Sequence, residues 1–220
     1  MKKNLLTLTA IAVAMSLTQC NSNCGDKCKN GENCNSATEC QTSENQVVKT
    51  IMERRSIRKY KDTPVEHDKL AEIAKCGINA PSGMNKQPWE IRIVESQELI
   101  NQVNEVYKKA NPDIIEKDPT FKNMFRNAPN IICVATAEGG YLDCGLLGEN
   151  MMLAAQSMGL GTCCLGGPVR FIKENEGAKF FLEKLGFSEG YELDYILAVG
   201  YPDESPDAKP RDENKVQYIK

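Results

Sequence analysis

The segment Ala80–Glu90, "APSGMNKQPWE", holds the only Trp of the chain and two of its ten prolines. Three polar side chains that can contact a ligand, Ser82, Asn85 and Gln87, lie between those prolines. Trp89 begins the alternating stretch "WEIRIVE", which predicts a strand anchored in the core by the indole ring. A plain surface turn needs no Trp, so the segment is either a helix-to-strand connection or a ligand-binding loop.

Length and composition suit one globular domain. The chain has 220 residues, of which 41% are hydrophobic, and a formal net charge of −3. About 175 residues follow the N-terminal segment, enough to bury a sizeable core. The near-neutral charge gives no electrostatic basis for nucleic-acid binding, where a basic face is expected. The one histidine, His67, is predicted to be solvated at a helix start, so a His-rich metal site is excluded and no metal is expected.

The N-terminal residues predict an export signal rather than part of a fold. Two lysines precede the apolar run Leu5–Leu17, which is too short to span a bilayer comfortably and fits a signal-peptide core. The following "LTQC" resembles a bacterial lipobox, although Gln19 stands where a small residue is usual. We therefore expect a signal peptide at residues 1–19 and lipidation of Cys20, which implies a membrane-anchored lipoprotein of the bacterial cell envelope. Secretion with cleavage elsewhere, or a cytoplasmic protein, are the alternatives.

Residues 20–45 predict a Cys-rich flexible tether. They are rich in Gly, Asn and Ser and almost free of apolar side chains, so burial cannot offset the entropy of ordering them. Four cysteines, Cys24, Cys28, Cys34 and Cys40, favour two disulfides or unpaired thiols over a metal site, because no Cys-x-x-Cys pair is present. The pairing stays open among three connectivities.

The remaining residues, 46–220, form the predicted domain, in which helices and strands follow one another irregularly. Helical periodicity recurs in five stretches, 46–55, 66–80, 95–110, 143–161 and 171–187. Strands are predicted at 89–95, 130–137 and 191–202, with a last short one at 216–220. Because no regular alternation of strand and helix is present, the order favours an α+β fold.

A basic cluster closes the first predicted helix. In "ERRSIRKY", Arg54, Arg55, Ser56 and Arg58 offer three guanidinium groups and a hydroxyl within five residues. Arginine binds phosphate through paired charge-assisted hydrogen bonds, so this cluster suits a phosphate group. A solvated basic helix end, favoured by the helix dipole, is the alternative.

A glycine-rich stretch, "MGLGTCCLGGPVR" at 158–170, follows the longest predicted helix. Its glycines allow a flat ligand to approach the backbone closely. It is not a dinucleotide fingerprint, because it follows a helix instead of a strand, and a helix C-cap with a turn is the other explanation. Nearer the C-terminus, "AKPR" supplies Lys209 and Arg211, which are surface charges unless a ligand uses them.

Together these motifs resemble the nitroreductase family of flavoproteins. The resemblance covers roughly residues 46–212, and the Arg-Arg-Ser-x-Arg element with Ala-Pro-Ser-x-x-Asn-x-Gln-Pro-Trp is its most specific part. It implies an α+β fold with a mixed, mainly antiparallel sheet packed with helices. It also implies an intertwined homodimer with FMN at the interface.

The resemblance implies a set of cofactor contacts, residue by residue. Arg54, Ser56 and Arg58, with Arg55 alongside, correspond to contacts with the ribityl phosphate and the ring edge. Pro81, Ser82 and Met84 correspond to the segment that reaches the flavin of the partner subunit, with the polar side chains of Asn85 and Gln87 near it. Leu165, Gly166 and Gly167 correspond to the strip that faces the ring, and Lys209 and Arg211 to the pair that holds the phosphate. Cys164 stands where the family often has Trp, and residues 108–126, the cover region, show no recognisable pattern.

The implied activity is hydride transfer from NAD(P)H through flavin N5 to nitroaromatic, quinone or related acceptors, in a ping-pong order. No nucleophile, triad or metal cluster is required, because the flavin carries the chemistry. Reductive dehalogenation or ene-type reduction on the same scaffold is one alternative. A non-catalytic, membrane-tethered flavin-binding protein is another, since NAD(P)H is scarce outside the cytoplasm.

Five cysteines lie in the predicted domain. Cys133, in an apolar strand, and Cys144, on an apolar helix, are expected to be small core residues. Adjacent Cys163 and Cys164 would form only a strained disulfide, so free thiols near the flavin are expected instead.

Overall fold

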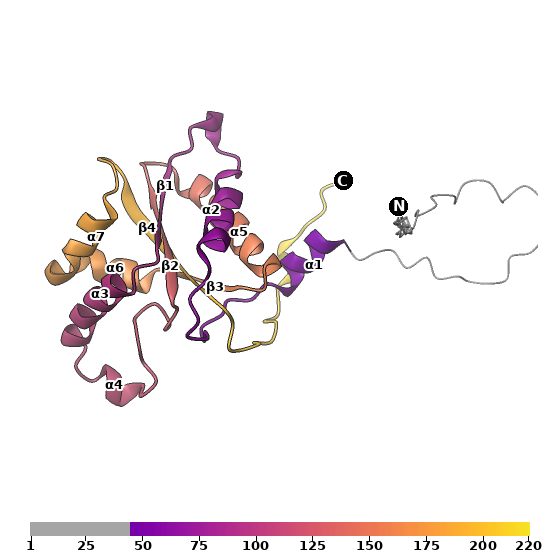
Figure 1. Ribbon diagram of the computed structural model, residues 1–220. Coiled ribbons are helices and arrows are strands. Elements are labelled where there is room, and N and C mark those ends of the chain that lie inside the picture. Colours follow the sequence, from indigo (N-terminus) through magenta and orange to yellow (C-terminus); the bar gives the residue numbers. More distant parts are fainter. Residues whose placement is uncertain (1–44) are drawn as a thin grey trace, which may run out of the picture. The chain divides into compact units, whose positions relative to one another are not determined.

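A four-stranded antiparallel sheet forms the centre of the computed structural model, which describes residues 45–220 (Figure 1). Its strands are β1 (Trp89–Val94), β2 (Asn130–Thr136), β3 (Gly161–Leu165) and β4 (Glu192–Gly200), in the spatial order β1-β2-β4-β3. Every neighbouring pair is antiparallel. The expected α+β class and antiparallel sheet are confirmed. The signal peptide, the lipidation of Cys20 and the tether cysteines lie outside the described residues.

Seven α-helices surround this sheet in the described part of the chain. They are α1 (Gln46–Glu53), α2 (His67–Ile78), α3 (Gln97–Ala110), α4 (Ile114–Lys117), α5 (Tyr141–Ser157), α6 (Gly167–Glu174) and α7 (Lys179–Leu185). Helices α3, α6 and α7 lie on one side of the sheet, and α2 and α5 lie on the other (Figure 1). The predicted helices at 46–55, 66–80, 95–110 and 143–161 are confirmed to within a few residues at each end.

The alternation of side chains along β2 explains this three-layer arrangement. Ile131 and Cys133 pack with the side chains of α3, α6 and α7, whereas Ile132 and Val134 pack with those of α2 and α5. Successive residues of a strand point to opposite faces, so a strand covered on both faces must be apolar throughout. All seven residues of β2 are buried, which accounts for the continuous apolar run in the sequence.

The predicted helix at 171–187 is wrong, because two helices and a turn occupy that stretch. Helix α6 ends at Glu174, and Asn175 adopts extended backbone angles of −96° and 116°. Its side-chain oxygen accepts a hydrogen bond from the Gly177 N–H and so caps the 3-10 turn η2 (Glu176–Ala178) before α7 begins. An Asn that caps a new helical turn competes with continuation of the old one, which periodicity alone does not reveal.

Two further differences concern strands. The glycine-rich stretch 158–170 contains β3, which sequence patterns missed because only five residues, flanked by glycines, pair with β4. The predicted strand at 216–220 is wrong: these residues are exposed and pair with no strand, and the nearest regular element is the 3-10 turn η3 (Glu213–Lys215). A strand needs a neighbour for its backbone hydrogen bonds, and the tail has none within the described residues.

Three local predictions are confirmed. Trp89 is buried at the start of β1, as expected from its position before an alternating run. His67 is an exposed residue at the start of α2, where its Nδ1 lies 2.9 Å from a carboxylate oxygen of Glu95. Cys133 and Cys144 are buried in the core.

Candidate functional site

A large cavity, here called the main cavity, lies between the end of β3 and the segments that flank α4. Its volume is about 1140 Å³. Pockets for one small molecule usually measure about 300–1,000 Å³, so the main cavity has room for a cofactor and a second small molecule. One side is formed by residues 58–60 together with the β3 strip, which we define as Cys163–Gly167.

The basic cluster enters this cavity because the chain after α1 runs alongside β3. Ser56 pairs with Thr162 in a parallel bridge, and the Ile57 N–H donates to the Thr162 carbonyl at 2.9 Å. The next residue, Arg58, lines the main cavity. The Arg58 backbone N–H donates to the Glu204 carboxylate, which fastens this stretch to the segment that follows β4.

The β3 strip carries two glycines that packing within the chain does not require. A Cβ atom at Gly166 or Gly167 would meet no other atom within 4 Å. The φ angle of Gly166 is −97°, which any residue adopts, so the backbone does not require glycine there either. By contrast, a Cβ atom at Gly161 would lie 2.6 Å from Cγ1 of Ile57. The open space above Gly166 and Gly167 therefore suits a flat group that approaches the backbone closely.

Tyr60, Cys163 and Cys164, the phenol and the two thiols beside the β3 strip, stay protonated at neutral pH. Burial raises the pKa of Tyr60 well above its ordinary value, and the Tyr60 hydroxyl donates to the Ile57 carbonyl at 2.6 Å. Burial also raises the pKa of Cys163, although the positive charges of Arg58 and Arg126 oppose it. The thiol of Cys164 has a raised pKa for the same main reason. None of these groups is a thiolate or a general base at this pH, so the arrangement suits a ligand that supplies its own chemistry.

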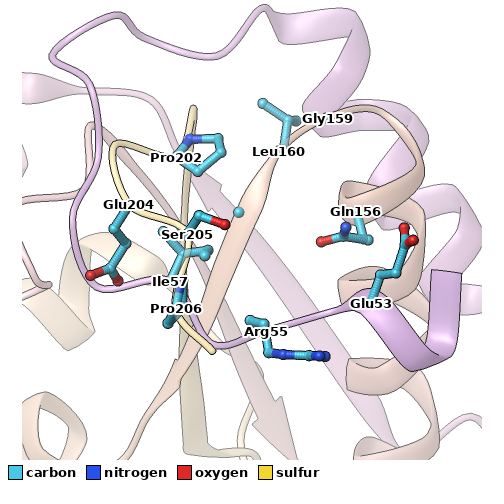
Figure 2. Close-up of a pocket in the computed structure, with 11 residues that line it drawn as sticks. Glu53, Arg55, Ile57, Gln156, Gly159, Leu160, Pro202, Glu204, Ser205 and Pro206 are labelled. Carbon is cyan, nitrogen blue, oxygen red and sulfur yellow. The ribbon is translucent and has the colours of Figure 1, made fainter. Parts of the chain in front are cut away.

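The other members of the Arg-Arg-Ser-x-Arg element do not reach the main cavity. Arg54 forms an ion pair with Glu149 of α5, with 3.5 Å between Nε and Oε1. Arg55 donates to the carbonyls of Met52 and Arg54 at 2.6 and 2.9 Å. It lines a separate cavity of about 420 Å³, here called the side cavity (Figure 2).

The segment Pro81–Gln87 lies outside both cavities. It connects α2 to β1 and contains the 3-10 turn η1 (Gly83–Asn85). Met84, Asn85 and Gln87 have φ angles of 52°, 55° and 49°, in the left-handed region that only glycine adopts without cost. Met84 is 84% exposed. Such strain at an exposed segment indicates a function beyond connecting two elements.

The tail residues Lys209 and Arg211 also lie outside both cavities. Both are exposed, and the Arg211 guanidinium donates to the Lys209 carbonyl at 3.1 Å. Of the predicted cofactor residues, Arg58, Leu165, Gly166 and Gly167 line the main cavity, and the others do not.

The opposite side of the main cavity was missed by sequence reasoning. It includes an aromatic wall, which we define as Tyr107, Phe121 and Phe171, together with Arg126 and Arg170. These residues come from α3, the segment after α4, and α6. These residues share no local sequence pattern. The one available signal was that Phe121 and Arg126 lie within residues 108–126, the predicted cover region.

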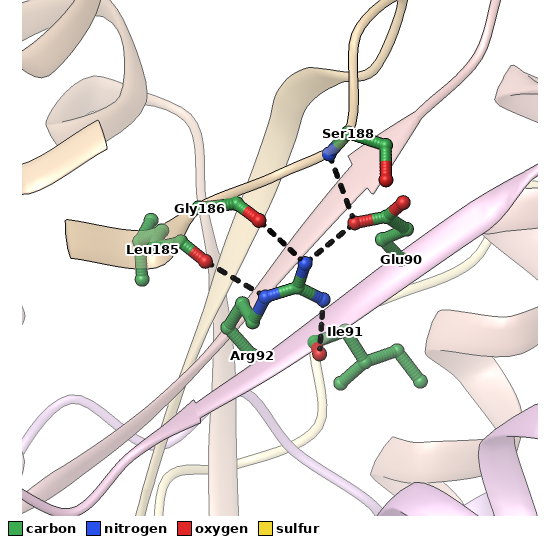
Figure 3. Close-up of polar contacts among 6 residues, drawn as sticks. All are labelled: Glu90, Ile91, Arg92, Leu185, Gly186 and Ser188. Atoms are coloured by element: carbon green, nitrogen blue, oxygen red, sulfur yellow. Dashed lines mark hydrogen bonds and ion pairs between the residues drawn. The ribbon is translucent and has the colours of Figure 1, made fainter. Parts of the chain in front are cut away.

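A second charged cluster is structural and lies on the edge strand β1 (Figure 3). Arg92 donates to the carbonyls of Leu185 and Gly186 at 2.7 and 2.8 Å and contacts the Glu90 carboxylate at 2.6 Å. Its guanidinium also lies 4.8 Å from the centre of the Phe187 ring. Four of the five guanidinium N–H groups donate within the chain, so this cluster ties the edge of the sheet to the end of α7.

Comparison with known proteins decides the family. A sequence model described as the nitroreductase family matches residues 51–201. The chain belongs to the nitroreductase family. The matched range includes Arg54 to Arg58, the segment Pro81–Gln87 and the β3 strip, which are the motifs that carried the resemblance.

Individual relatives and a solved structure agree with this membership. A protein of Archaeoglobus fulgidus, provisionally named NADH dehydrogenase/NAD(P)H nitroreductase, is 29% identical over 176 residues, which are 76% of this chain and 92% of that protein. An iodotyrosine deiodinase of Thermotoga neapolitana is 29% identical over 186 residues, covering 75% of this chain and 93% of that one. A nitroreductase with bound FMN from Desulfitobacterium hafniense has a TM-score of 0.69 at 28% identity, covering 80% and 99% of the two chains.

Two further observations bear on the surroundings of the site. Within residues 45–220, all five cysteines are free, including Cys163 and Cys164 beside the main cavity. None of the helices in that range combines the length and the apolar character that crossing a membrane requires.

Proposed function

We propose that this protein is an FMN-dependent oxidoreductase that passes hydride from NAD(P)H to nitroaromatic, quinone or related acceptors. The observation that carries the proposal is the open β3 strip: Gly166 and Gly167 leave space that nothing within the chain fills, beside Arg58 in a large cavity. Family membership and the FMN bound to the Desulfitobacterium hafniense structure support the choice of cofactor. FMN held in this cavity would supply hydride transfer through its N5, and a donor and an acceptor that share one site would react in a ping-pong order.

The residues of this chain would bind and orient the cofactor. The guanidinium of Arg58 can pair with an anionic oxygen, at the phosphate or at the edge of the reduced ring system. We propose that the backbone N–H groups of Gly166 and Gly167, which line the main cavity, donate to the cofactor, whereas Pro168 has no N–H to offer. Tyr60 and Cys163 stay protonated, so no protein nucleophile competes at the site. In nitro reduction the acceptor takes two electrons and two protons and yields a nitroso group and water.

A homodimer is part of the proposal. Pro81–Gln87, Lys209 and Arg211 lie outside the main cavity of their own chain, and we propose that they complete the main cavity of a second copy. Exposed large apolar side chains on α1, α5 and the tail would be covered in such an assembly: Val47, Val48, Ile51, Met52, Tyr141, Leu142, Leu146, Val216, Tyr218 and Ile219. Exposed apolar groups gathered in this number favour an interface over a solvated surface.

The decisive experiment is a visible spectrum of the purified full-length protein, followed by anaerobic titration with NADH and with NADPH. We expect flavin absorption that bleaches with at least one donor and returns on addition of a nitroaromatic or a quinone. If no flavin copurifies and added FMN does not bind, the proposal is wrong. A flavin that binds but is reduced by neither donor would favour the non-catalytic, flavin-binding alternative.

Reductive dehalogenation is the second candidate, because the chain is 29% identical to the Thermotoga neapolitana iodotyrosine deiodinase over most of both lengths. Steady-state assays with halogenated phenols and with nitro compounds, using the same donor, separate the two. A higher kcat/KM for the halogenated phenols would show that they, and not the nitroaromatics, are the preferred acceptors. The proposed cofactor would stay the same.

For the cellular location we propose a lipid anchor on Cys20, supported by the signal-like sequence before it. Metabolic labelling with a radioactive fatty acid, compared between the native protein and a Cys20→Ala variant, tests this. Label in the native protein and none in the variant is expected. Equal label in both would show that the anchor is elsewhere or that the proposal is wrong.

A further inference from the structure

The main cavity has a second side that the proposed cofactor contacts leave unused. In the aromatic wall, Tyr107 stacks on Phe121 with 5.8 Å between ring centres. Phe171 is nearly perpendicular to Tyr107, with 5.0 Å between ring centres. All three rings are half-buried and line the cavity. A continuous aromatic surface of this kind favours a flat apolar or aromatic ligand.

The segment that carries Phe121 is built as a fixed structure and not as a loose lid. The Asn127 side-chain oxygen accepts hydrogen bonds from the N–H groups of Lys122 and Asn123 at 2.8 and 2.9 Å. From α3, the buried Asn104 accepts the Met124 N–H at 3.2 Å and donates to the Lys122 carbonyl at 2.7 Å. Side-chain amides replace the regular backbone pairing here, so the wall is already formed before a ligand arrives.

The charges beside the wall point to an anionic ligand. Arg170 of α6 lines the cavity next to Phe171, and its guanidinium has no hydrogen-bond or ion-pair partner among residues 45–220. Four acidic residues line the cavity: Asp118, Glu174, Asp203 and Glu204. Asp118 accepts from Thr120, Glu204 accepts from the Arg58 N–H, and Asp203 lies beside Glu204 in the segment after β4. Glu174 lies one turn beyond Arg170 and forms no ion pair with it.

Arg126 and Arg170 serve different parts of the cavity. The positive charge of Arg126 opposes the rise in the pKa values of Tyr60 and Cys163, so Arg126 also acts on the groups beside the β3 strip. Arg170 lies on α6 directly before Phe171 of the aromatic wall, and both residues line the main cavity. We infer that Arg170 determines specificity for aromatic acceptors that carry an anionic group, such as a carboxylate, with the ring against the aromatic wall. This inference rests on the proposed function.

The test measures the oxidative half-reaction alone. Dithionite-reduced holoprotein is mixed anaerobically with 4-nitrobenzoate, its neutral methyl ester, or a cationic 4-nitrobenzyl trimethylammonium salt. We expect the native protein to be reoxidised about tenfold faster per unit concentration by the anion than by the ester, the size typical of one charge-assisted contact at a partly solvated site. Arg170→Ala should remove this preference, and Arg170→Lys should retain part of it, because Lys keeps the charge without the planar fork.

Lys173→Ala is the matched control, since Lys173 is a cation on the same helix that pairs with Glu192 at 2.7 Å and does not line the cavity. It should leave the preference unchanged. Equal rates for all three probes, or an equal loss for all three in Arg170→Ala, overturn the inference. So does an Arg170→Ala variant that slows reduction by NADH or NADPH and not reoxidation, because Arg170 would then bind the donor. Absence of flavin from the native protein is a different result, which rejects the proposed function itself.

Discussion

The β3 strip and the segment Pro81–Gln87 were both expected to contact the same flavin, yet they differ in every structural respect. The strip lies in the main cavity, has relaxed backbone angles and carries glycines that face open space. The segment is exposed, contains three strained non-glycine residues and lines neither cavity of its own chain. The difference teaches that one chain holds only part of the contacts that the family resemblance implies, and the predictions below test how the parts combine.

The largest effects are expected from two glycines at opposite ends of β3: Gly161, which begins the strand, and Gly167, which begins α6 just after it. Gly161→Val should lower the free energy of unfolding by about 3 kcal/mol, because its side chain would overlap Ile57. Gly167→Val should leave the free energy of unfolding within about 0.5 kcal/mol of the native value, because the space is open. The same variant should weaken FMN binding by about 100-fold, since valine takes the space of the ligand.

Urea unfolding without added flavin and FMN titration measure the two quantities for both variants. If Gly167→Val unfolds the chain as readily as Gly161→Val, the open space is not a ligand site but a region that the structure needs empty for folding.

The double change Ser82→Ala and Asn85→Ala removes polar contacts of the exposed segment Pro81–Gln87. It should weaken FMN binding by about tenfold, a smaller effect than that of Gly167→Val. An Arg58→Ala variant should bind FMN weakly as well. When the two variants are expressed together with different tags and purified through both, the heterodimer should regain FMN in one of its two sites. That site combines an intact cavity from one chain with an intact segment from the other.

Tandem purification and flavin content per dimer provide the measurement. Homodimers of each variant are the controls, and both should contain little flavin. A heterodimer with no more flavin than the homodimers would mean that the segment serves its own chain, and failure of the two tagged chains to copurify would reject the dimer.

Met84→Gly should raise the free energy of unfolding by about 1 kcal/mol, because glycine adopts the positive φ angle of residue 84 at little cost. The variant should be more stable than the native chain and should bind FMN a few-fold more weakly if the Met84 side chain contacts flavin. Met52→Gly is the control: Met52 is an exposed methionine inside α1, where glycine should destabilise by about 1 kcal/mol. Thermal unfolding compares the two. A destabilised Met84→Gly variant would show that the segment is not strained.

The smallest effect concerns thiol labelling in the strip and away from it. Cys164 lies at the main cavity, and the pKa of its thiol is raised above the ordinary 9.0, so its labelling rate should still be rising when the pH passes 9. Only the thiolate reacts, and a raised pKa lowers its fraction at any lower pH. Bound FMN should slow the labelling of Cys164 several-fold and leave that of Cys76, which lines neither cavity, unchanged. Peptide mass spectrometry reads both sites, and equal protection of both thiols would argue against FMN in the main cavity.

Sequence patterns predicted well those elements whose signal is local. Strand β2 is a continuous apolar run because both of its faces are covered, and β1 alternates behind Trp89. Patterns failed where a long-range partner decides the outcome. The five residues of β3 form a strand only because β4 lies beside them. Residues 216–220 form no strand, because no described strand lies beside them. The helix predicted at 171–187 is interrupted at Asn175 because this side chain caps a new helical turn, and helical periodicity of apolar residues does not reveal such a cap.

For the candidate site, the sequence alone determined the residues whose type is itself the signal: the cluster from Arg54 to Arg58, the paired glycines at 166 and 167, and the polar segment before Trp89. Only the tertiary structure decided that Arg58 and the β3 strip share one cavity while Arg55 faces another. It alone assembled Tyr107, Phe121, Phe171 and Arg170, because these residues come from separate segments. Their chemistry depends on distances that exist only after those segments have packed on the sheet.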